Sequence, residues 1–469
     1  MADGFTYPGV YVQEGAGTFL SLHHASTAVP AFLAVLGEFR LLFDFDKPYV
    51  KLSAWQDVEM HIARRVTAMV TARTEEAEFT EQNASHLLQY WQKEKDREEA
   101  AAQKKGATAT DGFLAARGAF AGWLRDEFHY AWLIVRSLKA YFENGGGPCY
   151  VLAGWRDDEP GMKAVMTLEE VTLLVEAGTA FPLNSGGQNP DYLDTISRTS
   201  AINLNVCNAD TGIFGLFDVD IRGNKWDEKI DAYLPDTSFA AAYGPFLTRR
   251  IRQEETLSKK SDFDIVVPPS AVIAGIYCKV DRERGVWKAP ANVDVVTQLQ
   301  AAYRIPEQAA GDLNSGHLHP DFKTKGIAGP PINVIRRVRG AALTVWGART
   351  LARNDDDFRY VSVRRLFDTV KRDILSALAS SAYEPNCPST WERARAAIDH
   401  YLYALWTRGA LLGEQAHDAY HVAVGLGTTM REEDIAAGLM KVNMGLAAVR
   451  PAEFIVLHLG QKMASKLVR

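Results

Sequence analysis

Acidic and histidine side chains in the middle of the sequence have the residue types that a metal site needs. Asp218 and Asp220 end the apolar run GIFGLFDVD, Asp227 follows shortly after, and His317 and His319 form a His-x-His pair. Acids that end a strand face solvent more often than a metal, and the histidines lie among Gly, Pro and Ser with no acid at a fixed offset. We therefore predict no metal site and an exposed loop over residues 311–329.

A run of three glycines, Gly145 to Gly147, has the composition of a loop that binds phosphate. The predicted order is helix, glycines, strand, whereas a phosphate loop follows a strand and precedes a helix whose N-terminus faces the anion. The sequence also has no Gly-Lys dipeptide, nucleophile elbow, His-Glu-x-x-His helix or dinucleotide fingerprint. We predict no catalytic residue and no cofactor, with an enzyme assembled from scattered residues as the alternative.

Composition narrows the classes further. The four cysteines, Cys149, Cys207, Cys278 and Cys387, are far apart, so neither a zinc site nor a disulfide framework is indicated, and each is predicted to pack as a small apolar residue. The formal net charge of −6 argues against a general nucleic-acid binder. No basic cluster begins the sequence and no apolar run approaches the ~20 residues that span a bilayer, which predicts synthesis in the cytoplasm without membrane insertion.

Strands and helices are predicted to alternate, which is typical of an α/β or α+β protein. At 469 residues, two or three domains are expected. Apolar runs predict a central strand at 29–37 and strands at 149–153, 202–210 and 212–220, whereas helical spacing predicts helices at 128–142, 363–379 and 391–412. A loop is expected over 249–264, and 332–351 is interpreted as strand, turn and strand with Val345 and Trp346 buried.

Residues 56–126 are interpreted as a helical insertion. Trp55, Val58, Ile62 and Val66 recur at helical spacing, and a Gly, Thr and Ala-rich connection follows. Inserted segments are tolerated where they do not interrupt the core, so we expect this one on the outer surface. It is either a solvated decoration or a docking site for another component.

Residues 271–292 change character in the middle. The first half, rich in small and β-branched apolar residues, is either the end of a buried strand or the start of a packed helix. The second half is predicted to be a rigid turn that carries Arg282, Arg284, Trp287 and Lys288. Such a turn is a candidate anchor for a partner surface.

The densest basic cluster consists of Arg336, Arg337 and Arg339. Two interpretations stay open. The cluster either forms ion pairs with the acids at 355–357 in the following loop or contacts a neighbouring subunit.

The two ends of the sequence are predicted to form short strands. Val10 and Val12 alternate with Tyr11 near the N-terminus, and near the C-terminus an apolar strand that needs cover on both faces contains Phe454, Ile455, Val456 and Leu457. The N-terminal strand is either an edge strand of its own domain or a strand added to the sheet of another subunit.

Several segments, in order, resemble the contractile tail sheath family of phage tails, bacteriocins and related injection systems. They are YPGVYVQE, FENGGGPCYVL, the stretch AVIAGIYCKVDRERGVWKAPAN, INVIRRVRGAALTVWGARTLA with FRYVSVRRLF after it, and VRPAEFIVLHL. They cover both termini and most of the chain beyond residue 266.

The resemblance implies a multidomain subunit with a discontinuous core domain. Residues 1–40 would form the N-terminal arm and first part of the core, 41–255 an outward middle domain, 256–448 the core, and 449–469 a C-terminal arm. Subunits of this family stack as six-fold rings around an inner tube, exchange terminal strands and contract to drive the tube through a membrane. The expected partners are therefore further copies of the chain, a tube protein, and baseplate and cap proteins. A specialised paralogue at the baseplate or cap end is the alternative.

Overall fold

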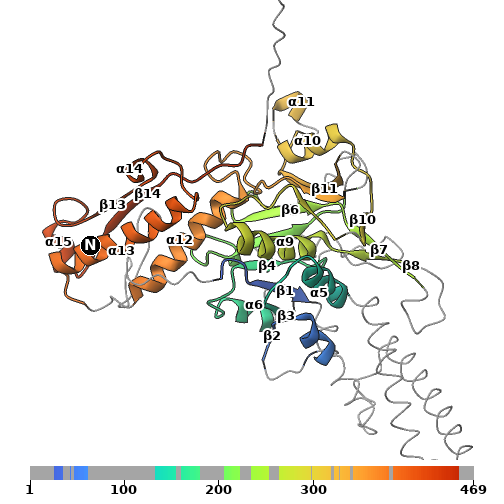
Figure 1. Cartoon of the computed structure of the whole chain (residues 1–469), viewed down its shortest axis with the longest axis horizontal. Helices are drawn as coiled ribbons and strands as arrows, with labels where there is room; N and C mark the ends of the chain where they lie inside the picture. Colours follow the sequence, from blue (N-terminus) through green and yellow to red (C-terminus); the bar gives the residue numbers. More distant parts are fainter. Residues whose placement is uncertain are drawn as a thin grey trace, which may run out of the picture.

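The computed structural model gives a mixed α/β protein with two lobes (Figure 1). It describes residues 26–34, 43, 47–61, 133–154, 160–179, 205–221, 234–252, 263–296, 298–317, 319, 322–326, 328–338, 342–379 and 384–453. The predicted terminal strands and most of the predicted insertion therefore lie outside the described residues. In the part of the chain that is described, no helix is both long and apolar enough to cross a bilayer.

A nine-stranded sheet organises the larger lobe. Its strand order is β2-β3-β1-β4-β5-β6-β11-β12-β9. The run from β3 to β11 is parallel, and the antiparallel strands β2, β12 and β9 lie at its two edges. The strands are β1 (Pro30–Ala34), β2 (Tyr49–Leu52), β3 (Cys149–Ala153), β4 (Leu173–Val175), β5 (Phe214–Asp218), β6 (Ala240–Gly244), β9 (Val293–Asp294), β11 (Ile332–Arg337) and β12 (Leu343–Trp346).

Helices cover both faces of this sheet, as an apolar parallel sheet requires. On one face α5 (Leu133–Glu143) and α9 (Pro269–Arg284) bury the largest core cluster. On the other face α6 (Pro160–Val165) packs near β1 and β3, and α10 (Glu307–Ser315) packs near β6 and β11. A smaller sheet in the order β10-β7-β8 adjoins α5 and is formed by β7 (Leu247–Ile251), β8 (Phe263–Val267) and β10 (Leu299–Ala301). We call the two sheets with their helices, including α11 (Phe322–Lys325), the sheet lobe.

The second lobe, residues 361–449, lies at the left of Figure 1 in orange to red. We call it the C-terminal lobe. α12 packs on α13, and α13 packs on a two-stranded antiparallel hairpin, so that these elements bury a core of their own. Its elements are α12 (Val361–Ala379), α13 (Pro388–Thr407), α14 (Ala416–Ala419), β13 (Tyr420–Val424), α15 (Glu432–Ala436) and β14 (Val442–Leu446).

The stretch at 271–292 begins as a helix rather than the end of a strand. Nearly every residue of α9 from Pro269 to Val280 is buried, between the sheet and α5. A helix that is apolar on all sides has no amphipathic period, which is why the sequence left both interpretations open. α9 and α5 approach closely at Gly275, where an added Cβ would lie 2.4 Å from the Tyr141 carbonyl oxygen.

Many predicted elements are confirmed. The strand predicted at 149–153 is β3, the strand predicted at 212–220 contains β5, and the central strand predicted at 29–37 contains β1, which pairs on both edges. The helices predicted at 128–142, 363–379 and 391–412 correspond to α5, α12 and α13.

Four local predictions are wrong. Residues 205–210 form a helical turn and bends instead of a strand, because the Asn208 side chain accepts the N–H groups of residues 210 and 211. The loop expected at 249–264 begins in β7 and ends in β8, and its residues 253–262 lie outside the described residues. The loop expected at 311–329 contains parts of α10 and α11. Trp346 is 42% exposed, because alternation along β12 turns it away from the core that holds Val345.

The sheet joins strands from both sides of residue 255. β6, from the predicted outward region, pairs in parallel with β11, from the predicted core region. Val58, inside the predicted insertion, is fully buried in the main core. The division of the chain into regions with separate roles in an assembly stays a prediction.

Candidate functional site

The turn after α9 lies between the two lobes. Gly285 ends the helix with φ 93°, and an added Cβ would lie 2.4 Å from the Trp287 ring. Val286 and Trp287 pack into the core of the C-terminal lobe, and the Arg408 guanidinium lies 4.9 Å from the Trp287 ring centre. Trp287 thus joins the lobes of one chain.

The cations of this turn are placed differently. Arg282 Nη2 donates to the Gly145 carbonyl oxygen at 3.3 Å, and Lys288 Nζ donates to the Ala289 carbonyl oxygen at 3.2 Å. Burial, with the nearby charge of Arg284, lowers the pKa of Lys288 below its usual value. A contact of these residues with a neighbouring subunit stays a prediction.

A buried ion pair one turn earlier also joins the lobes. The Arg365 guanidinium of α12 donates to both carboxylate oxygens of Asp281 on α9, at 2.6 and 3.1 Å, and both side chains are about 5% exposed or less. Thr27 completes the cluster, since its hydroxyl donates to Asp281 at 2.6 Å and its carbonyl oxygen accepts from Arg365 at 2.9 Å. The Arg365 guanidinium also lies 4.6 Å from the centre of the Tyr277 ring.

This cluster fixes the chain where the described N-terminal segment begins. Arg372, also on α12, donates to the Ser26 carbonyl oxygen at 3.2 Å, and Thr172 donates to the Thr27 carbonyl oxygen at 3.1 Å. Sequence analysis missed these residues because single charges on two separate helices form no motif. The signal was α12 itself, which has a run of charged residues opposite its apolar stripe.

Arg336 and Arg337 end β11, where Arg336 is half-buried and Arg337 is exposed, and Arg339 lies outside the described residues. The acids proposed as their partners bind elsewhere. Asp356 pairs with Arg359, and Asp357 accepts from Arg450 at 3.1 Å. The role of the arginine cluster in subunit contact stays a prediction.

The β13–β14 hairpin presents two unlike faces. Tyr420, Val422 and Val424 lie opposite Leu446, Met444 and Val442, and most of these apolar side chains pack on the C-terminal lobe. The opposite face carries His421 and Asn443 with small residues across from them. Within the described ranges each strand pairs only with the other, and a two-stranded sheet by itself is marginally stable in water. The hairpin therefore suits the addition of strands at its edges.

Two acids are buried at the N-terminus of α9. Asp218 accepts the Ser270 N–H, the Ser270 hydroxyl and the Gly178 N–H, each at 2.7 Å, and Glu176 accepts the Asp218 N–H at 2.6 Å. Burial raises the pKa of Asp218 to about 6 and that of Glu176 well above its usual range. Asp218, considered above as a metal ligand, instead caps a helix.

Other candidate chemistry is accounted for locally. His317 stacks on Phe322 with ring centres 3.8 Å apart, and the described residues contain no group of three or more His, Cys, Asp or Glu side chains suited to a metal. Cys149, Cys207 and Cys278 are buried as predicted. The same prediction is wrong for Cys387, which is half-buried, and hydrogen bonding with Ser389 lowers its pKa to about 7.

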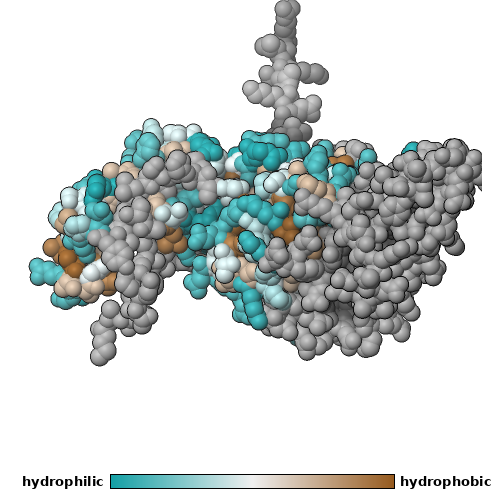
Figure 2. Space-filling view, turned by 90° about the horizontal axis from the view of Figure 1, so that it is seen from below, coloured by the Kyte–Doolittle hydropathy of each residue, from teal (hydrophilic) through white to brown (hydrophobic). Residues whose placement is uncertain are grey.

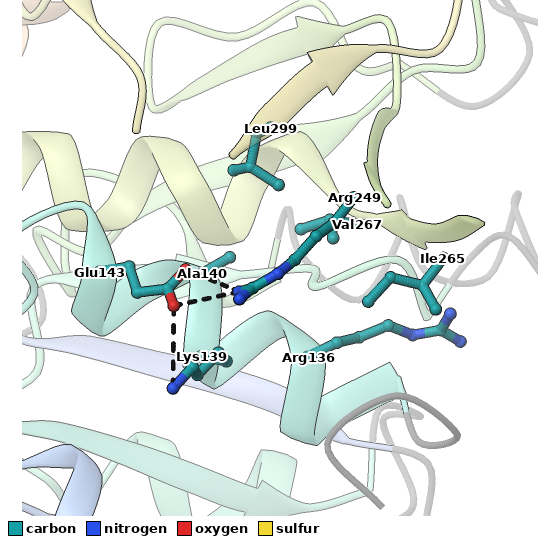
Figure 3. A pocket seen from close by; sticks show the side chains of 8 residues that line it. All are labelled: Arg136, Lys139, Ala140, Glu143, Arg249, Ile265, Val267 and Leu299. Carbon is teal, nitrogen blue, oxygen red and sulfur yellow. Dashed lines mark hydrogen bonds and ion pairs between the residues drawn. The ribbon is translucent and has the colours of Figure 1, made fainter. Parts of the chain in front are cut away.

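A small pocket lies between α5 and the three-stranded sheet (Figure 3). Two of its cations are paired within the pocket, because Glu143 binds Arg249 at 3.0 Å and Lys139 at 3.7 Å. Ile265, Val267 and Leu299 supply apolar side chains. The arrangement is that of a surface ion-pair network and offers no arrangement of nucleophile and base.

Comparison with known proteins gives one consistent result. The phage tail sheath C-terminal domain family matches residues 353–461. The PVC sheath complex of an extracellular contractile injection system, solved in the contracted state, is similar to this chain at 32% identity, with 98% of this chain and 99% of that chain covered and a TM-score of 0.63. A search of the curated proteins found no match.

Two structures of the anti-feeding prophage (AFP) are also similar. The helical sheath in the contracted state is 30% identical, and the 6-fold symmetrised baseplate is 29% identical. Each alignment covers 98% of this chain and 100% of the other, with a TM-score of 0.61.

Proposed function

The chain belongs to the contractile tail sheath family and is a structural subunit of a contractile sheath. We propose that it polymerises as stacked six-fold rings around an inner tube. In this proposal the assembly contracts and drives the tube through a target membrane. The observation that carries the proposal is similarity over nearly the whole length of a sheath solved in its contracted state. The six-fold ring follows the symmetry of the related baseplate structure.

The hairpin supports a specific mode of linkage. We infer that the terminal strands, containing Val10 to Val12 and Phe454 to Leu457, add to the β13–β14 hairpin of neighbouring subunits. Strand addition supplies main-chain hydrogen bonds that fix direction and register. Because donor and acceptor surfaces differ, the association is heterologous and builds rings or a filament.

In this proposal the working part is the assembled particle. The subunit is made in the cytoplasm and released as part of a phage tail-like particle, with tube, baseplate and cap proteins as partners and no nucleic acid. It has no catalytic residue and no cofactor. Energy for contraction is stored in a metastable extended assembly.

A second role is favoured by one observation. Similarity extends to chains solved in the AFP baseplate, both 6-fold symmetrised and contracted. A paralogue restricted to the baseplate end would form a ring but no long sheath.

Negative-stain electron microscopy of the purified protein, alone and with its tube protein, tests both roles. We expect long striated sheaths in the presence of the tube. Single rings would favour the baseplate role. A chain that remains monomeric at high concentration by sedimentation would contradict both.

A further inference from the structure

The C-terminal end of the described chain crosses from one lobe to the other. After β14 the backbone runs beside residues 410–412, with Leu412 N–H donating to the Ala447 carbonyl oxygen at 2.7 Å and Val449 N–H donating to that of Ala410 at 3.2 Å. The segment then leaves the C-terminal lobe toward α10 (Figure 1). Its last described residue, Glu453, lies on the sheet lobe.

Four hydrogen bonds hold the Glu453 carboxylate. Oε1 accepts from Asn314 Nδ2 at 2.8 Å and from Arg349 Nε at 2.9 Å. Oε2 accepts from Arg349 Nη2 at 2.7 Å and from the Tyr360 hydroxyl at 3.1 Å. The donors come from α10, from the segment after β12 and from the residue before α12. We call Glu453 with these three residues the Glu453 clamp.

The arginine of the clamp is itself fixed to the sheet. Its N–H donates to Asn333 Oδ1 at 2.8 Å, and Asn333 Nδ2 donates back to the Arg349 carbonyl oxygen at 2.8 Å. Asn333 is fully buried in β11 and also donates to the Ala242 carbonyl oxygen in β6. Gly347 makes this close approach possible, since an added Cβ would lie 2.7 Å from the Asn333 and Asn314 side-chain oxygens.

Burial separates the clamp from ordinary surface ion pairs. The Arg349 and Glu453 side chains are 12% and 18% exposed, whereas those of the nearby Arg450 and Asp357 pair are 51% and 85% exposed. Bidentate charge-assisted hydrogen bonds shielded from water are strong, but exposed pairs contribute little. The clamp is therefore the firm attachment of this segment, and the Arg450 pair is a natural control.

We propose that Glu453 is a positioning residue that fixes the root of the C-terminal arm to the sheet lobe. The inference rests on the proposed exchange of arms between subunits. A tensile force on the arm is then transmitted through Arg349 and Asn333 to β11, and the half-exposed β13–β14 hairpin does not carry it. Each subunit would give its arm from the sheet lobe and receive an arm on the C-terminal lobe, so the ion pair of Asp281 and Arg365 lies on the path of the load.

The test compares Glu453→Gln with Asp357→Asn, the latter removing the exposed pair. All partners of the Glu453 carboxylate are hydrogen-bond donors. In Glu453→Gln the NH₂ group of the amide would face one of these donors, so hydrogen bonding in the clamp is weakened while the side chain keeps its shape. In the free subunit, hydrogen exchange at residues 448–453 should rise on the order of tenfold in Glu453→Gln, because about one charge-assisted hydrogen bond is lost, while exchange in β11 stays unchanged. Asp357→Asn should match the unaltered protein.

The same variants are then assembled with the tube protein and exposed to increasing guanidinium. Electron microscopy should show that Glu453→Gln sheaths break into short pieces at denaturant concentrations that Asp357→Asn sheaths survive. Equal survival of the two variants would overturn the inference while leaving the proposed function intact. If the unaltered protein forms no sheath, the proposed function fails instead. Should Glu453→Gln not fold, Tyr360→Phe, which deletes one donor, must show the same breakage at a smaller amplitude or the inference is rejected.

Discussion

The sheet lobe and the C-terminal lobe complete their cores in different ways. β1, β3, β5 and β6 are buried along their whole length, under helices of the same chain on both faces. β13 and β14 are mostly half-exposed and pair only with each other among the described residues. Figure 2 shows apolar surface at the outer end of the C-terminal lobe, with polar surface around it. The described strands of the sheet lobe are thus covered within the chain, whereas the β13–β14 hairpin of the C-terminal lobe stays half-exposed.

The junction between the two lobes differs from both, because buried charged side chains pair across it. α12 turns its apolar side toward α13 and its charged side toward α9, so the lobes meet through buried ions as well as Trp287. Arg364 lies between the rings of Phe239 and Phe358, at 4.4 and 4.2 Å from their centres, and pairs with Asp368. Removing one partner of such a buried pair is costly, because the other charge is left buried without compensation.

The largest effect is expected on filament assembly, when the N-terminal arm is removed. Removal of residues 1–15 should abolish filament assembly while leaving the subunit folded, because an arm outside its own core contributes little burial. Circular dichroism reports the fold, and electron microscopy reports assembly. Tyr11→Pro should act in the same way if its N–H pairs with a neighbouring strand. Normal filaments from the truncated chain would refute arm exchange, and unfolding would place the strand within its own subunit.

The junction should respond next most strongly. Arg365→Ala leaves the Asp281 carboxylate buried without its cation, and we expect a loss of about 3–5 kcal/mol in the free energy of unfolding. Denaturant titration measures it. The double variant Asp281→Leu with Arg365→Met should recover most of the loss, since neither charge remains. A loss below about 1 kcal/mol for Arg365→Ala would show that the pair behaves as a surface pair.

A smaller effect is expected inside the sheet lobe as pH changes. Burial raises the folded-state pKa of Glu176 and Asp218. From about pH 4 up to about pH 6, and further for Glu176, the folded protein therefore keeps protons that the unfolded chain has released. Stability should therefore fall as pH rises through this window. Glu176→Gln should reduce the difference in unfolding free energy between pH 5 and pH 8, because it removes one of the two titrating groups.

The matched control is Glu170→Gln. Hydrogen bonds from Lys51 and Tyr150 lower the pKa of Glu170, so this group is largely ionised in the folded and unfolded chain between pH 5 and pH 8. Its replacement should leave the pH dependence in that interval unchanged. If Glu176→Gln and Glu170→Gln give the same pH dependence, the buried acids do not control it.

The smallest effect is predicted for the insertion. The predicted boundary at residue 56 is too early for a deletion, since Val58 is buried and Trp55 packs against the same core. Replacing residues 64–126 by a short Gly-Ser linker should leave the denaturation midpoint of the subunit nearly unchanged. Loss of soluble protein would show that the segment belongs to the core.

Sequence patterns located the apolar elements well and the polar ones poorly. Continuous apolar runs marked β1, β3 and β5, because a strand buried on both faces is apolar at every position. Helical spacing marked α12 and α13, because burial on one side of a helix leaves a periodic pattern. The turn around Asn208 escaped because a side chain there competes for backbone N–H groups, which no hydrophobic pattern records. β7 and β8 escaped because their charged residues resemble those of a loop.

The sequence by itself determined the family, the α/β class and the absence of known catalytic motifs, since these depend on residue types at short spacing. Only the tertiary structure decided which charges meet. Thr27, Asp281 and Arg365 are separated by up to 338 positions, and Arg349 and Glu453 by 104. Such pairs form because the sheet and its helices bring distant segments together, and no local pattern carries that information. The physical reason is that periodicity records burial against solvent, whereas the partner of a buried charge is set by the path of the whole chain.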